Sequence, residues 1–66
     1  MNNEKREEAE ALLKYMASHN RHHAKELEEV AAALPEKTAE IIHEAIRILN
    51  EGNDQLDAAV KSLEEE

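Results

Sequence analysis

Cysteine is absent from this sequence, and glycine, proline and aromatic residues are scarce. The 66 residues include one glycine, one proline and a single aromatic residue, Tyr15. Without cysteine, disulfides, thiolate metal sites and thiol catalysis are excluded. Glycine and proline mark turns, and no alternating pattern typical of strands is present. The composition therefore predicts an all-α protein with a single helical domain over residues 1–66.

Positive charge is also scarce. Eight Lys and Arg residues stand against 16 Asp and Glu residues, which gives a formal net charge of −8. Nucleic acids and anionic membranes bind surfaces with an excess of Lys and Arg, so neither is expected as a partner. No apolar stretch approaches the roughly 18 residues of a membrane span, and no positively charged leader precedes a hydrophobic region. We therefore expect a cytoplasmic protein.

Apolar residues recur in two runs with the alternating spacing of three and four residues that is typical of coiled-coil helices. The first run is Ala9, Leu13, Met16, Asn20, His23, Leu27, Val30 and Leu34. The second run is Ala39, Ile42, Ile46, Leu49, Asn53, Leu56, Val60 and Leu63. Between them, Pro35 disfavours helix at the residue before it and fits the first position of a new helix. The pattern predicts an antiparallel hairpin of two long helices, about 3–33 and 36–64.

Gly52 and Asn53 leave an alternative open. A glycine costs about 1 kcal/mol relative to alanine inside a helix, and glycine often follows a helix end. A three-helix bundle would break the chain at Gly52-Asn53, with Asn53 or Asp54 capping a third helix. We favour the unbroken hairpin because the spacing of the second run continues through this point, which a turn has no reason to preserve.

The chain is small for a stable monomer. Chains below about 70–80 residues rarely bury enough apolar surface to be stable alone. Next to the second run, one face of the helix carries small or apolar residues and is too hydrophobic to be exposed to solvent. These residues are Ile41, Ala45, Ile48 and Gly52. We expect another helix to cover this face. The sequence thus predicts a homodimer through these four residues, in which two hairpins form a four-helix bundle.

A cluster of histidines occupies the first helix. His19, His22, His23 and Glu26 are spaced i, i+3, i+4 and i+7, so they project from one face. Two imidazoles at i and i+4 can bind one ion, and a third ligand from His22 or Glu26 would leave an open coordination position. Nitrogen and oxygen donors without sulfur suit a transition-metal ion of the zinc, nickel or cobalt class. We therefore predict a small helical protein that binds such an ion.

The positions of His23 and Asn20 support this hypothesis, because leucine is expected there. Burying an imidazole or an amide without a partner costs roughly 1–3 kcal/mol, so such residues should be satisfied or used. The alternative is a structural or protein-interaction bundle without a ligand. In that case the histidines lie on a solvated face, and Asn20 and Asn53 fix the register of the helices.

Enzymatic activity is not expected. The sequence contains no cysteine nucleophile and no nucleophile elbow, and its only serines are Ser18 and Ser62. Ser18 precedes His19 directly, and adjacent residues of a helix do not face each other.

The segments His19-Asn20-Arg21-His22-His23-Ala24-Lys25-Glu26-Leu27 and Gly52-Asn53-Asp54-Gln55-Leu56 carry H-N-x-x-H-A-x-E-L and N-x-x-L elements. In these elements the chain resembles a small uncharacterised helical family of anaerobic microbes. The resemblance carries no activity with it, and implies at most that His19, Asn20, His23 and Glu26 act as a unit.

Overall fold

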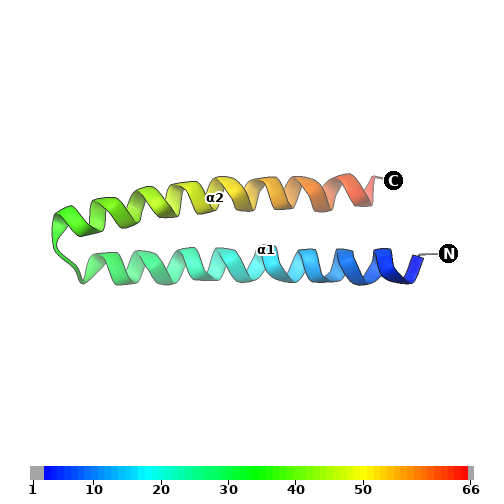
Figure 1. The fold of residues 1–66 in the computed structure, drawn as a ribbon, viewed down its shortest axis with the longest axis horizontal. Coiled ribbons are helices and arrows are strands. Elements are labelled where there is room, and N and C mark those ends of the chain that lie inside the picture. Colours follow the sequence, from blue (N-terminus) through cyan, green and yellow to red (C-terminus); the bar gives the residue numbers. More distant parts are fainter. Residues whose placement is uncertain (1–2, 66) are drawn as a thin grey trace.

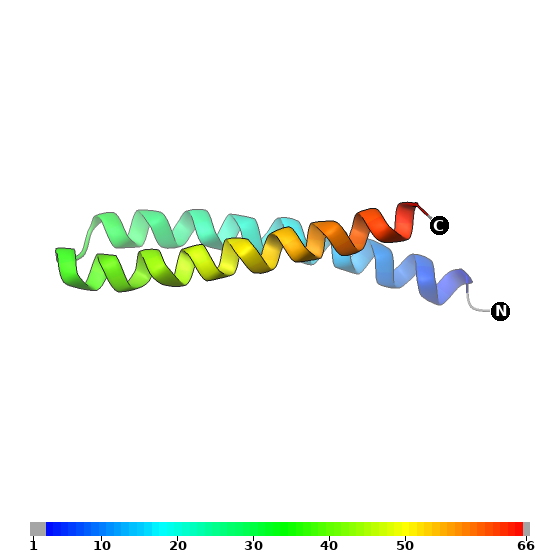
Figure 2. The same cartoon turned by 90° about the horizontal axis from the view of Figure 1, so that it is seen from above.

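The computed structural model describes residues 3–65, which form two helices joined by a short turn. Helix α1 spans Asn3–Ala32 and helix α2 spans Glu36–Glu64. The helices lie side by side in opposite directions, so both ends of the chain are at the same end of a rod (Figure 1) that measures 53 × 15 × 12 Å. Seen from above, they cross at a shallow angle (Figure 2). The predicted all-α hairpin is confirmed, whereas pairing into a four-helix bundle stays a prediction.

The turn is held by backbone hydrogen bonds. The amides of Ala33 and Leu34 donate to the carbonyls of Val30 and Ala31, both at 3.1 Å, and so tighten the last turn of α1. Pro35 has an extended backbone, with φ −57° and ψ 151°. Its carbonyl accepts the amide of Ala39 at 2.8 Å, so Pro35 caps α2. Helix α2 therefore has the predicted bounds, 36–64, with Pro35 directly before its first residue.

Helix α2 packs as its apolar run predicts. Ile46 and Asn53 are buried, and the other members of the run are half-buried: Ala39, Ile42, Leu49, Leu56, Val60 and Leu63. Gly52 lies inside the helix, and no described residue has a positive φ. The three-helix alternative with a break at Gly52-Asn53 is therefore wrong.

Helix α1 packs through a different set of residues from the one predicted. The residues that face α2 are the buried Ala17, Ala24 and Ala31 and the half-buried Glu10, Leu13, Asn20 and Leu27, together called the α1 seam. Met16 and Val30 remain 47% and 48% exposed, and Ala9, His23 and Leu34 are also exposed. The predicted core positions for these five residues are wrong. Ala17, Ala24 and Ala31 face α2 where Met16, His23 and Val30 were expected. The distance between two helices depends on the side chains at their contact, and these small residues let α2 come close.

The resulting core is thin. Among the described residues, the buried apolar side chains are three alanines of the α1 seam and Ile46. The surface area is 5277 Å², whereas a compact monomer of 7.5 kDa exposes about 4,200 Å². The hairpin thus exposes about 1,000 Å² more than a compact fold of the same mass. Neither helix, within residues 3–65, is both long and apolar enough to cross a membrane.

Candidate functional site

One side of the hairpin is lined by ion pairs between the two helices. Arg21 of α1 pairs with Asp54 at 3.2 Å and also with Asp57, and Lys14 pairs with Glu64 at 3.2 Å. The hydrogen bond to Asp57, followed by the one to Asp54, raises the pKa of Arg21. The pKa of Lys14 is raised mainly by its hydrogen bond to Glu64. These side chains are exposed to solvent, which screens their charges, so the pairs contribute little to stability. We call this side the ion-pair flank.

The residues of the ion-pair flank share a position in the heptad pattern. Lys14 and Arg21 directly follow Leu13 and Asn20 of the α1 seam, and Asp54 directly follows Asn53 of α2. Successive helical residues are rotated by about 100°, so a residue directly before a core position lies on the opposite side from one directly after it. The residues before the core positions of both helices therefore share the other side of the hairpin.

We call this other side the apolar flank. On α1 it consists of Leu12, Met16, His19, His23, Glu26 and Val30. On α2 it consists of Ile41, Ala45, Ile48, Gly52, Gln55 and Ala59. Both sets repeat with spacings of four and three residues, as core positions do. The large apolar members are exposed, with Ile41 the most exposed at 66%. An exposed apolar patch of this kind is typical of an interaction site.

The predicted metal ligands contact one another: His19, His23 and Glu26 belong to the apolar flank, and His22 lies beside it. His19 Nε2 and His23 Nε2 are 2.9 Å apart, and His23 Nδ1 lies 2.9 Å from Glu26 Oε1. His22 Nε2 is 3.5 Å from the other carboxylate oxygen of Glu26. The ring of Tyr15 stacks on that of His19 with centroids 5.4 Å apart. The hydrogen bond from His23, followed by the positive potential of His22, lowers the pKa of Glu26.

These contacts do not form a metal site. No group of three or more His, Asp or Glu residues within residues 3–65 is arranged to hold an ion. The reason lies in the ring of His23, whose two nitrogens point to different partners, Nε2 to His19 and Nδ1 to Glu26. The nitrogen and oxygen donors therefore do not converge on one point. The predicted metal-binding function, with His19, His22, His23 and Glu26 as ligands, is therefore wrong.

The burial argument for the metal site also fails. The side chain of His23 is 51% exposed, so no buried imidazole needs a partner. Two apolar runs overlap in α1, and the predicted core position of His23 belongs to the run that does not face α2. The correct run places Ala24 in the core and leaves His23 on the apolar flank.

Beside His23, the surface of α1 forms an apolar groove of about 520 Å³. It is lined by His23, Glu26, Leu27 and Val30, which we call the α1 groove. The hydrogen bond between His23 and Glu26 fixes the polar edge of the groove, while Leu27 and Val30 supply its aliphatic surface. All four residues come from one helix, so the groove is open and has no opposing wall from α2. A small-molecule site would bury most of its ligand, which this groove does not.

Asn53 is the polar residue at the centre of the hairpin. It is 1% exposed, and its Nδ2 has no hydrogen-bond partner among residues 3–65. Asn20 of the α1 seam is half-buried, and no hydrogen bond joins the two amides. An unsatisfied buried amide costs about 1–3 kcal/mol. Asn53 therefore weakens the contact between α1 and α2.

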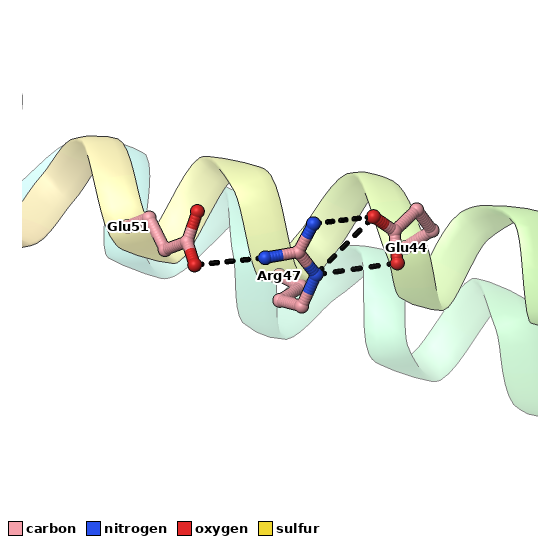
Figure 3. A network of polar contacts seen from close by, with 3 residues as sticks. All are labelled: Glu44, Arg47 and Glu51. Carbon is pink, nitrogen blue, oxygen red and sulfur yellow. Dashed lines mark hydrogen bonds and ion pairs between the residues drawn. The ribbon is translucent and has the colours of Figure 1, made fainter.

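A further polar cluster lies entirely on α2. Arg47 donates hydrogen bonds to Glu44 at 2.5 Å and to Glu51 at 2.8 Å (Figure 3). The hydrogen bond from Arg47 lowers the pKa of Glu44. All three side chains are exposed and belong to successive turns of the same helix. The cluster supports α2 and brings no other element near it.

Comparison with known proteins identifies a family for this chain. The sequence model of a family described as Domain of unknown function (DUF8180) matches residues 9–63. No curated protein and no solved structure matches the chain. The matched segment covers both helices and the turn, including the α1 seam and the apolar flank. The chain therefore belongs to the DUF8180 family.

Proposed function

We propose that this protein is an interaction module that works as a homodimer, with the apolar flanks of two hairpins in contact. The observation that carries this proposal is the exposed apolar flank, which runs along both helices. Its exposed members include Leu12 and Val30 on α1 and Ile41 and Ile48 on α2. Four helices around one core would then bury the residues that a single hairpin leaves in water.

The surface area supports a partner of the size of a second copy. The hairpin exposes about 1,000 Å² more than a compact chain of its mass. Each partner in a standard protein interface loses about 800 Å². Covering the apolar flank would therefore bring the exposed area of each chain close to that of a compact protein.

The thin core favours a second copy over an unrelated partner. Three alanines and one isoleucine form the buried apolar core of residues 3–65, so a partner that covers the apolar flank would add substantially to the stability of the chain. A second copy is present wherever the chain is made, whereas another protein must be supplied. Homodimers with two-fold symmetry are also the commonest soluble oligomers.

Charge does not oppose this arrangement locally. The net charge of −8 repels a second copy, but the single acidic residue of the apolar flank is Glu26, which contacts His22 and His23. The other acidic side chains lie outside the flank, where salt screens repulsion beyond about 8–10 Å. Dimerisation should therefore strengthen as the salt concentration rises.

The proposal includes no catalytic step. A cytoplasmic location and the absence of nucleic-acid partners stay expectations from composition and charge. The anaerobic source and the motif elements of the family resemblance also stay predictions.

Sedimentation equilibrium of the full chain tests the proposal. We expect twice the chain mass of 7.5 kDa at micromolar concentration. Ile48→Glu places a carboxylate on the apolar flank and should give a monomer. His43→Glu is the matched control, because it adds the same side chain to the same helix beside Ile42, on the ion-pair flank. It should leave the dimer intact. A monomeric wild-type chain, or equal masses for both variants, would refute the proposal.

A further inference from the structure

We propose that Ile41 of a second copy fills the α1 groove, and that Ile41 of the first copy fills the same groove of the second. This inference rests on the homodimer proposed above and specifies which residues meet in it. It also fixes the symmetry of the dimer, with a two-fold axis along the helices.

The spacing of the groove residues supports this contact. His23, Glu26, Leu27 and Val30 are spaced i, i+3, i+4 and i+7. Four residues with this spacing form the hole that receives one side chain of a facing helix when helices pack knobs-into-holes. Within its own chain, α2 packs on the neighbouring α1 seam and leaves this hole open. The α1 groove is therefore a complete hole without its knob.

Ile41 has the chemistry and the position of the missing knob. It is the most exposed large apolar residue of the apolar flank, at 66%. The turn between the antiparallel helices lies at Leu34 and Pro35, so residues at the same height have numbers that add to about 69. The centre of the groove, between Glu26 and Leu27, thus lies at the height of residues 42–43 of α2. Ile41 is the member of the flank nearest to this height.

A two-fold axis parallel to the helices keeps every residue at its own height. Under that symmetry α2 of the second copy runs antiparallel to α1 of the first, as neighbours do in an antiparallel four-helix bundle. The apolar flank is rotated by about 100° from the core positions of the same helix. In a four-helix bundle, each helix has two adjacent helices, and the directions from it to these two helices differ by about a right angle. The rotation of about 100° is close to this angle. Each helix can therefore contact its own partner and one helix of the second copy.

The same symmetry gives the next heptad a matching contact. Ile48 reaches a second hole on α1, formed by Met16, His19, Asn20 and His23. Ile41 and Ile48 are seven residues apart, and the next residue with this spacing is Gln55. Gly52 lies between Ile48 and Gln55, and an added Cβ there would meet no atom of its own chain within 4 Å. The missing side chain has no use within the hairpin, but it lets a helix of the second copy come close.

Cysteine cross-linking tests the contact directly, because the chain has no cysteine of its own. Single variants Val30→Cys and Ile41→Cys are mixed as full-length chains and oxidised. A disulfide requires Cβ atoms about 3.5–4.5 Å apart. We expect the mixed disulfide to form at least several-fold faster than either homodimeric disulfide. The matched control is His43→Cys mixed with Val30→Cys, which should not cross-link because His43 lies on the ion-pair flank.

The outcomes separate this inference from the proposed dimer. If wild-type chain sediments as a dimer but the homodimeric Val30→Cys or Ile41→Cys disulfide prevails, the knob assignment is overturned and the dimer stands. If the chain is monomeric, both fall. As a second measurement, Ile41→Ala should weaken the dimer Kd by about tenfold per knob, and by on the order of a hundredfold for the two knobs of a dimer. An unchanged Kd would also overturn the inference.

Discussion

Replacing Gly52 by alanine should have opposite effects on the hairpin and on the dimer. In the single chain, Gly52 is an exposed position inside α2 without a positive φ, and an added Cβ meets no atom within 4 Å. Gly52→Ala should therefore stabilise the hairpin by about 1 kcal/mol through helix propensity alone. In a chain of this length, that corresponds to a rise of about 4–8 °C in Tm.

In the proposed dimer the same methyl group would lie between two chains. Gly52 belongs to the apolar flank, and its height corresponds to residue 17 of α1, next to the hole that includes Met16. Adding a methylene to a packed site costs about 1–3 kcal/mol. Each dimer contains two such sites, so the association free energy should weaken by about 2–6 kcal/mol.

Thermal unfolding followed by circular dichroism at several concentrations measures both effects. In the monomeric Ile48→Glu background, Gly52→Ala should raise Tm at every concentration. In the wild-type background, the gain should shrink or change sign as the concentration rises into the range of the dimer. An equal gain at all concentrations would show that no second copy packs on Gly52. A loss in the Ile48→Glu background would contradict the open space around this residue.

Two further predictions concern polar side chains. Asn53→Leu should raise the free energy of unfolding by about 1–3 kcal/mol, because it removes the unpaired Nδ2. Urea unfolding measures this change, and a lower free energy of unfolding would mean that the amide has a partner. His23→Ala should raise the pKa of Glu26 toward its ordinary value, because the hydrogen bond from His23 is the main cause of the lowered pKa. The stabilisation from this contact is present above the ordinary pKa of Glu26 and is lost as the pH falls through the lowered value. A carboxyl titration by NMR checks this, and an unchanged pKa would contradict the contact.

The hairpin could be predicted from the sequence because α2 has only one possible core face. Its large residues at core positions, such as Ile42, Ile46 and Leu49, repeat with one phase through Gly52. Pro35 then places the turn within one residue of its observed position. Periodicity is a strong signal when a single run of large apolar residues exists.

The core face of α1 could not be predicted in the same way, because two runs overlap there. Both contain Leu13, Asn20 and Leu27, and they differ by one residue at four positions, where Ala9, Met16, His23 and Val30 stand beside Glu10, Ala17, Ala24 and Ala31. Side-chain size favours the first set, whereas the close approach of α2 requires the second. Only the distance between the helices decides between them, and the sequence of one helix does not contain that distance.

The metal hypothesis failed at a similar step. The spacing of His19 and His23 shows that both rings leave the same face of α1. It does not show which nitrogen of each ring points to the other, and that orientation decides whether the donors converge. In the structure, His23 uses one nitrogen for His19 and the other for Glu26. Two candidate ligands at i and i+4 therefore do not predict a metal site by themselves, because their donor atoms must also converge on one point.

The same contacts explain how histidines fit on a flank that is otherwise apolar. With neutral rings, His19 Nε2–H donates to His23 Nε2, and His23 Nδ1–H donates to Glu26. Each polar atom in this chain of contacts therefore has its partner within α1. A polar group that is already paired costs much less to bury than an unpaired one, for which the cost is about 1–3 kcal/mol. A second copy can thus cover the ring of His23 without supplying hydrogen bonds to it.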